Sequence, residues 1–244
     1  MSFYKEKLMR IRIKLLKVLI NLNERIIFER KLFKFYNKKS ACNVVFDVGA
    51  NQGQTIDFFL RINPSCEIYA FEPNRKLYHL LVEKYKKQPN VKLFMLGISD
   101  VSGMKTFYEN IFDFTSTFEE VNKSSIHLEK KRKILGAKSS NLIKDTYDVE
   151  VVTLCSFIKK IGINKIDVLK IDTEGHEFAC LKGLFAEEIF CEIDFIQTEK
   201  LNGDMYNSDF AEILTFLNSN NYLLEKEIKH GFGNFEDVVF RKKS

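Results

Sequence analysis

The sequence predicts an α/β fold in which helices cover both faces of a mostly parallel β-sheet. Short apolar runs alternate along the chain with amphipathic segments of helical spacing. The apolar runs contain few polar residues, which is typical of parallel strands buried on both faces. A chain of 244 residues, 45% of them hydrophobic, is long enough for one such domain with a sizeable core.

The order of the elements follows from these patterns. We expect strands at residues 43–48, 67–71, 91–96, 166–171, 194–198, 222–228 and 236–241. We expect helices at residues 55–62, 75–87, 156–161, 178–188 and 210–218. The turn Gly231-Phe232-Gly233-Asn234 separates the last two strands and predicts that they pair as an antiparallel hairpin.

Residues 109–148 depart from this alternation. They are rich in Ser, Lys, Asn and Thr, have no clean period, and are long for a connection in a compact domain. Such insertions are usually functional loops. We therefore expect this segment to be a lid that closes over the substrate and excludes water.

A basic arm at residues 1–40 precedes the domain expected at residues 41–244. The arm holds twelve Lys and Arg against three Glu, whereas the net charge of the whole chain is +5, so the remainder is slightly acidic. Leu8, Ile11 and Leu15 have helical spacing, which predicts an amphipathic helix. The helix could pack on the domain, touch a membrane surface or an anionic substrate, or pair two protomers. The slightly acidic domain argues against nucleic acid as a partner.

The cysteines indicate a cytoplasmic protein. Their number is odd, they show no CxxC spacing, and most lie beside apolar residues, so we expect reduced thiols in the core. They are Cys42, Cys66, Cys155, Cys180 and Cys191. Charged residues interrupt the most apolar stretch of the arm, so we expect neither a signal peptide nor a membrane-spanning helix there.

A glycine-rich loop follows the first strand. Ligands of parallel α/β sheets bind beyond the carboxyl ends of the strands, and Asp47 to Gly53 lie at such an end. Gly49 can adopt a positive φ and let the backbone approach a ligand, while Gly53 permits close helix packing. The spacing is GxxxG and not the GxGxxG of dinucleotide sites. Glu72 ends the second strand, where a carboxylate can bind both ribose hydroxyls, so the two features together predict a nucleoside site.

Ser99 and Asp100 follow the third strand. Asp100 could accept a hydrogen bond from the exocyclic amine of adenine, with the backbone of Ser99 beside the ring. The structural alternative for Asp100 is an Asx turn or a helix cap.

The densest polar run of the chain follows the strand expected at residues 166–171. Asp172, Glu174 and His176 project there from one short turn, and Glu199 ends the next strand. Asp172 and Glu199 should therefore stand side by side at one rim of the sheet. Adjacent carboxylates can hold a divalent cation such as Mg²⁺ or act as a base and its orienting group. The alternatives are incidental strand-end or helix-end charges.

These blocks together resemble the FkbM family of methyltransferases. The resemblance lies in Phe46-Asp47-Val48-Gly49-Ala50-Asn51-Gln52-Gly53-Gln54-Thr55, Phe71-Glu72-Pro73, Ser99-Asp100 with Gly103, and Leu169-Lys170-Ile171-Asp172-Thr173-Glu174-Gly175-His176-Glu177. The blocks occur in the family's order between about residues 43 and 200. The resemblance implies the class I fold of methyltransferases that use S-adenosylmethionine (SAM), with seven strands and an antiparallel last strand.

The resemblance also implies O-methylation, commonly of a sugar hydroxyl in carbohydrate biosynthesis, and assigns roles to residues. Four loop residues would hold the methionine part of SAM: Asp47, Gly49, Asn51 and Gly53. Glu72 would hold the ribose, and Ser99 with Asp100 the adenine.

Two mechanisms stay open at this point. His176 could act as a general base on the acceptor hydroxyl, with Glu174 beside it in the same acidic turn. Alternatively, Asp172 and Glu199 could hold a cation that lowers the pKa of that hydroxyl. The acceptor could instead be a small phosphate-bearing or lipid metabolite, and a protein that binds SAM without catalysis is the alternative from another class.

Overall fold

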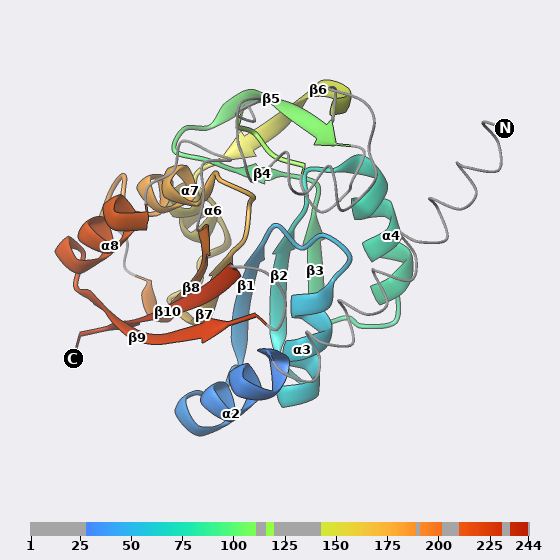
Figure 1. Ribbon diagram of the computed structural model, residues 1–244. Helices are drawn as coiled ribbons and strands as arrows, with labels where there is room; N and C mark the ends of the chain where they lie inside the picture. Colours follow the sequence, from blue (N-terminus) through green and yellow to red (C-terminus); the bar gives the residue numbers. More distant parts are fainter. Residues whose placement is uncertain are drawn as a thin grey trace, which may run out of the picture.

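The computed structural model describes residues 28–110, 116–119, 143–188, 191–201, 210–230 and 235–243. Its main sheet has seven strands in the order β3-β2-β1-β7-β8-β10-β9 (Figure 1). The strands are β1 (Val44–Val48), β2 (Glu67–Phe71), β3 (Val91–Phe94), β7 (Lys165–Ile171), β8 (Glu192–Leu201), β9 (Tyr222–Lys229) and β10 (Phe235–Lys242). The first five strands in this sheet order, β3, β2, β1, β7 and β8, pair in parallel. Strand β10 is antiparallel to both of its neighbours, β8 and β9. The predicted fold class and the closing antiparallel pair are confirmed.

Helices cover both faces of this sheet. One face packs against α2 (Glu29–Lys39), α3 (Gln54–Ile62) and α4 (Arg75–Tyr85). The other packs against α6 (Leu154–Ile161), α7 (Glu177–Leu184) and α8 (Phe210–Ser219). Successive strand residues point to opposite faces, so Val45 joins the first core and Phe46 the second. This double burial explains why the strands read as apolar runs.

Helix α2 makes up most of the described part of the basic arm, residues 28–40. Its Leu32 and Tyr36 are buried in the same core as Phe59 of α3, so this part of the arm packs on the domain. Residues 1–27, where most of the arm's amphipathic pattern lies, are outside the described residues. Within the described part, no helix is long and apolar enough to span a membrane. All five cysteines are free and buried, as expected.

A second sheet was not predicted. It contains β4 (Gly97–Ile98), β5 (Gly103–Asn110) and β6 (Ile143–Val152) in the order β4-β6-β5, and it lies beyond the end of the main sheet (Figure 1). The expected insertion at residues 109–148 is therefore too long, because its two ends belong to β5 and β6. These strands escaped notice because most of their side chains are at least partly exposed and polar, which leaves little apolar alternation. Residues 111–115 and 120–142, the centre of the expected lid, lie outside the described residues.

Helix α7 approaches the second sheet very closely at Gly183. A Cβ atom at this position would lie 2.0 Å from the carbonyl oxygen of Ser99 and 3.2 Å from the Cα of Asp100. The backbone that follows β4 is therefore seated directly on the helix, and it carries the two residues expected at the adenine.

We predict that Gly183→Ala destabilises the protein although alanine is the better helix former. Helix propensity alone would favour the substitution by ~1 kcal/mol. The methyl group must displace backbone, however, and overpacking of this kind typically costs about 1–3 kcal/mol. Urea denaturation measures the free energy of unfolding, with Asn218→Ala on the exposed side of α8 as the control. A Gly183→Ala protein as stable as wild type would contradict the close contact.

Candidate active site

The glycine-rich loop turns sharply at the end of β1. Gly49, Asn51 and Gly53 all have positive φ angles, of 89°, 50° and 82°. A Cβ atom at Gly49 would lie 1.9 Å from the carbonyl oxygen of Asp172, so the missing side chain serves the contact between two strand ends. A Cβ atom at Gly53 would lie 2.3 Å from the hydroxyl of Tyr85 in α4, in keeping with its expected role in helix packing. The loop is thereby held against the acidic turn that follows β7.

Glu72 is held rigidly beside this loop. Its Oε2 accepts a hydrogen bond of 2.6 Å from the backbone N–H of Asn51, and its Oε1 accepts one of 2.8 Å from that of Asn74. The residue is 5% exposed. Two charge-assisted bonds fix the direction of the carboxylate at the end of β2, the position expected for a group that binds a ribose.

Polar atoms of two loop side chains are buried without a hydrogen-bond partner among the described residues. Neither carboxylate oxygen of Asp47 has a hydrogen-bond partner in the described part of the chain. The Oδ1 atom of Asn51 also has none there. Burial raises the pKa of Asp47 to about 7, with Asp172 adding to the rise and Lys170 opposing it. Buried polar groups are normally hydrogen-bonded, and exceptions need an explanation such as an absent ligand. The residues expected at the methionine part of SAM therefore fit a donor-rich, positively charged group.

Ser99 and Asp100 form a different kind of site. Ser99 Oγ is completely buried, donates to Asp100 Oδ1 at 3.0 Å and lies 3.0 Å from His176 Nε2. Asp100 Oδ2 pairs with Lys182 at 3.3 Å. Burial alone would raise the pKa of Asp100, but the bonds from Ser99 and Lys182 hold it below its ordinary value. An ionised acceptor thus stands at the end of β4, where an adenine amine was expected.

His176 occupies an interior position. It is 1% exposed, its Nε2 faces Ser99, and its Nδ1 lies 2.6 Å from Glu119 Oε1. Both ring nitrogens are therefore engaged with the chain itself. This placement favours a role in joining residues 116–119 to the turn after β7 and does not favour the predicted role as general base.

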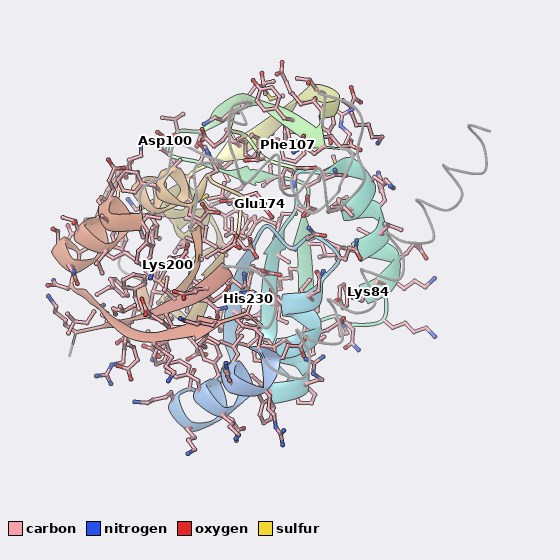
Figure 2. The ribbon with its side chains drawn as sticks, in the orientation of Figure 1. Lys84, Asp100, Phe107, Glu174, Lys200 and His230 are labelled. Carbon is pink, nitrogen blue, oxygen red and sulfur yellow. The ribbon has the colours of Figure 1, made fainter. Side chains whose placement is uncertain are left out.

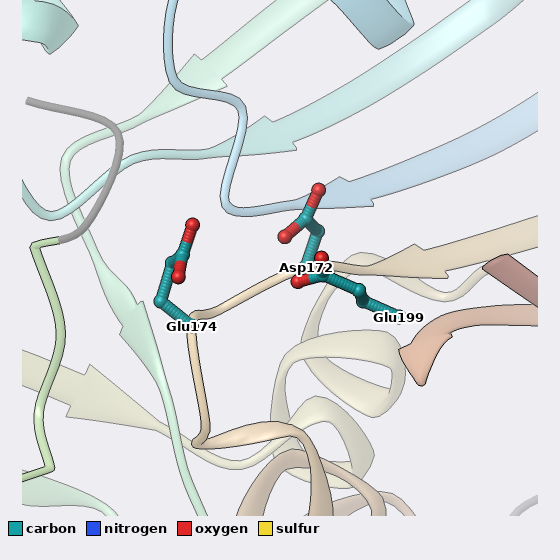
Figure 3. A group of neighbouring side chains, drawn as sticks. All are labelled: Asp172, Glu174 and Glu199. Atoms are coloured by element: carbon teal, nitrogen blue, oxygen red, sulfur yellow. The ribbon is translucent and has the colours of Figure 1, made fainter. Parts of the chain in front are cut away.

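Three carboxylates meet at the rim of the sheet. One oxygen each from Asp172, Glu174 and Glu199 lies within 4.8 Å of the others (Figure 3). Asp172 and Glu199 were expected side by side, and the parallel pairing of β7 with β8 brings them together. Glu199 does not end its strand as expected, because β8 continues to Leu201 through its pairing with β10. Glu174 lies between the main sheet and the second sheet (Figure 2).

The backbone of the acidic turn is strained and braced. Glu174 has a φ of 54°, uncommon for a residue with a side chain, and Gly175 has a φ of 101°. Glu177 Oε1 accepts hydrogen bonds from the backbone N–H groups of Thr173 at 2.8 Å and Gly175 at 3.1 Å. Strained residues persist where surrounding structure over-determines them, and they concentrate at functional sites. Here the buried Glu177 carboxylate holds the strained backbone in place through these hydrogen bonds.

Electrostatics distinguish the three carboxylates. Burial raises the pKa of Glu199 well above its ordinary value, and the charges of Asp172 and Glu174 raise it further. Asp172 is compensated by Lys170, whose Nζ donates to Asp172 Oδ2 at 2.8 Å. The site therefore tends to retain a proton or to attract a cation between its carboxylates.

Sequence reasoning assigned no role to Lys170, Glu177 or Glu119. Lys170 had a detectable signal, because it is the one charged residue between Val168 and Ile171 in a strand buried on both faces. From the sequence, Glu177 could equally be a favourable charge at a helix N-terminus with no part in the site. Glu119 gave no signal, since its contact with the turn spans 57 positions of the chain.

Comparisons with known proteins show the family of the chain. Residues 47–224 match the family model described as the methyltransferase FkbM domain. The chain is 23% identical over 163 residues to 2-O-methyltransferase NoeI of Sinorhizobium fredii, a match covering 67% of this chain and 65% of NoeI. It is 28% identical over 160 residues to methyltransferase sdnD of Sordaria araneosa, covering 59% of this chain and 61% of sdnD. The chain thus matches less than two thirds of the length of either relative.

A solved structure shows the same fold. The crystal structure of a methyltransferase FkbM from Methylobacillus flagellatus superposes with a TM-score of 0.52 at 12% identity, covering 82% of this chain and 44% of that one. With a family model that matches most of its length, the chain belongs to the FkbM family of methyltransferases and carries its methyltransferase domain at residues 47–224.

Proposed function

We propose that the chain transfers a methyl group from SAM to a hydroxyl of a sugar, as a nucleotide-activated sugar or a polysaccharide or glycolipid precursor. The observation that carries this proposal is the contact between the glycine-rich loop and the acidic turn. Gly49 touches the carbonyl of Asp172, so a donor on the loop and an acceptor at the carboxylates would be neighbours. A relative named as a 2-O-methyltransferase supports an oxygen acceptor.

The proposed donor site uses the loop and the two strand ends beside it. Asp47 and Asn51 offer buried, unpartnered acceptors to the charged amino group of the methionine part. Glu72 is oriented for the ribose hydroxyls, and Asp100 for the adenine amine. When bound, SAM supplies a methyl group activated by a positively charged sulfur.

The chain's own contribution is to hold the acceptor hydroxyl and to receive its proton. As the new oxygen–carbon bond forms and the carbon–sulfur bond breaks, the hydroxyl proton passes to a carboxylate of the Asp172, Glu174 and Glu199 group. Alignment of two bound reactants can lower a barrier by ~7–11 kcal/mol at best. A proton acceptor within reach typically adds about 10²–10⁴-fold in rate.

The carboxylates also fit a divalent cation. Three hard oxygen ligands within 4.8 Å of one another suit Mg²⁺ or a similar ion, which would make the acceptor hydroxyl more acidic. The raised pKa of Glu199 is consistent with such a site, because a cation would offset the crowding of negative charge. The metal-free alternative uses the same carboxylates as the base.

We expect the purified protein to form S-adenosylhomocysteine in the presence of nucleotide-linked hexoses or deoxyhexoses. Parallel reactions should contain phosphorylated metabolites, lipid alcohols, or no acceptor. If a cation takes part, EDTA should stop turnover and added Mg²⁺ or Mn²⁺ should restore it. Turnover that is unchanged by EDTA would establish the metal-free base. SAM binding without turnover on any acceptor would favour a non-catalytic protein.

Two substitutions should separate donor binding from chemistry. Glu72→Ala should weaken SAM binding at least about tenfold, because a buried charge-assisted contact to the ribose is lost. Asp172→Asn should preserve SAM binding and lower kcat at least about 100-fold, because the variant cannot accept a proton or hold a cation strongly. Calorimetric titration and turnover of both variants provide the measurement. Normal turnover by Asp172→Asn would refute the assignment of the acceptor site.

SAM affinity should depend on pH through Asp47. Its pKa of about 7 in the donor-free protein means that the carboxyl is largely neutral below pH 7 and largely charged above it. A cationic amino group binds the charged form, so affinity should fall by up to about tenfold per pH unit below 7. Asp47→Asn should bind more weakly with a nearly flat profile across the same range. An unchanged profile in that variant would place the titrating group elsewhere.

A further inference from the structure

Lys170 is a charged residue in the centre of the main sheet. Its neighbours in register are Asp47 on β1 and Gln197 on β8. All three side chains are at least 93% buried, and they form a polar row across strands that are otherwise apolar. Buried charges are costly unless they are paired and hydrogen-bonded, so this row requires its own explanation.

The row leads from the acceptor site to the helix α2. Lys170 Nζ donates to Asp172 Oδ2 at 2.8 Å and lies 3.9 Å from Asp237 Oδ2. The same Asp237 oxygen accepts a hydrogen bond of 2.5 Å from Gln197 Nε2, and Gln197 Oε1 accepts one of 2.8 Å from the hydroxyl of Tyr36. The carboxylate at the rim is thus linked by consecutive contacts to a residue of the arm.

The arm contacts this network a second time. His230 Nε2 lies 2.7 Å from the other Asp237 oxygen, and the ring of Phe28 stacks on the His230 ring at a centroid distance of 4.0 Å. Asp237 is therefore held between Gln197 and His230, and the arm packs on both of these partners. Residues 28–39 contribute to the surroundings of Asp237 although they lie outside the family match.

The charges of the network favour one fixed arrangement. Burial alone would lower the pKa of Lys170, but Asp172 and Asp237 raise it above the ordinary value. Burial would raise the pKa of Asp237, but Lys170 and His230 hold it low. The Lys170 side chain is 9% exposed and that of Asp172 is 40% exposed, so the direct bond between them ties a half-exposed carboxylate to a group fixed in the sheet.

We propose that Lys170 is the positioning residue of Asp172, and that α2 keeps Lys170 in place through Tyr36, Gln197 and Asp237. Lys170 acts through Asp172, because its amino group donates to Asp172 Oδ2 and so fixes the carboxylate that would meet the acceptor. This inference rests on the proposed function, because it assigns Asp172 to the acceptor site. It also gives the arm a role in catalysis, since the helix that packs on the sheet supports the acceptor carboxylate from behind.

The deciding variant is Tyr36→Phe, which removes one oxygen atom and keeps the aromatic packing. A loosened carboxylate should lower kcat about threefold to tenfold while the Kd for SAM stays unchanged, because misplacing a catalytic group is costly. The matched control is Tyr222→Phe, whose buried hydroxyl donates to the carbonyl of Ile193 on the opposite face of the sheet. The control should lose a similar amount of thermal stability with kcat within about twofold of wild type.

A cycle with Asp237→Asn tests whether the contacts act as one network. The double variant Tyr36→Phe/Asp237→Asn should lower kcat by less than the product of the two single effects, because both substitutions release the same lysine. The acceptor in these assays is the nucleotide sugar that gives the fastest turnover in the panel above. Lys170→Met should lower kcat at least about 100-fold if it folds, and the Tyr36 variant decides if it does not.

Each outcome has a defined meaning. If Tyr36→Phe keeps the kcat of the Tyr222→Phe control, the support from the arm is refuted. If a folded Lys170→Met keeps normal kcat, the positioning role is refuted as well. If Asp172→Asn itself turns over normally, the proposed acceptor site fails, and that result is distinct because it does not depend on the lysine.

Discussion

The parallel pairing of β1 with β7 is the constraint on which the site depends. The backbone N–H of Asp172 donates to the carbonyl of Val48 at 2.9 Å, and Gly49 then passes so close to Asp172 that no side chain fits between them. A glycine-rich loop and an acidic turn that are far apart in sequence thereby become one surface. Ligands of parallel sheets bind at the carboxyl ends of the strands, so the proposed donor and acceptor sites would meet on this surface.

Charges inside the sheet compete with its apolar packing. Replacing buried ion pairs by apolar residues is often neutral or stabilising, so stability alone gives little reason to retain Lys170 beside Asp172 and Asp237. The pairs do restrict geometry, because each carboxylate has few arrangements that keep the lysine compensated. Glu177 is a second buried charge that restricts geometry, because its carboxylate accepts hydrogen bonds from backbone N–H groups of the strained turn. In both places a buried charge fixes the shape of the rim.

The second sheet completes the site from the other side. Thr117 Oγ1 donates to the carbonyl of Thr173 at 3.3 Å, and Glu119 meets His176, so residues 116–119 rest on the acidic turn. The centroids of the Phe118 and His176 rings lie 5.3 Å apart. His176, which the sequence offers as a general base, thus also contacts Ser99 and Glu119 and links residues 116–119 to the acidic turn.

The sequence by itself determined the fold class, the order of the main strands along the chain and the polar residues at the ends of β1, β2 and β7. It did not determine that Glu199 lies inside β8 or that Ser99 follows β4 of a second sheet. The features that it determined follow from local rules: the burial of a strand fixes its apolar pattern, and a tight turn needs glycine. Only the tertiary structure revealed the second sheet, whose exposed polar strands lack such a pattern. It also decided which polar groups meet: Lys170 lies beside Asp237, Asp237 is linked through Gln197 to Tyr36, and Glu119 contacts His176. Those contacts are set by strand register and layer packing between distant segments, and no local spacing encodes them.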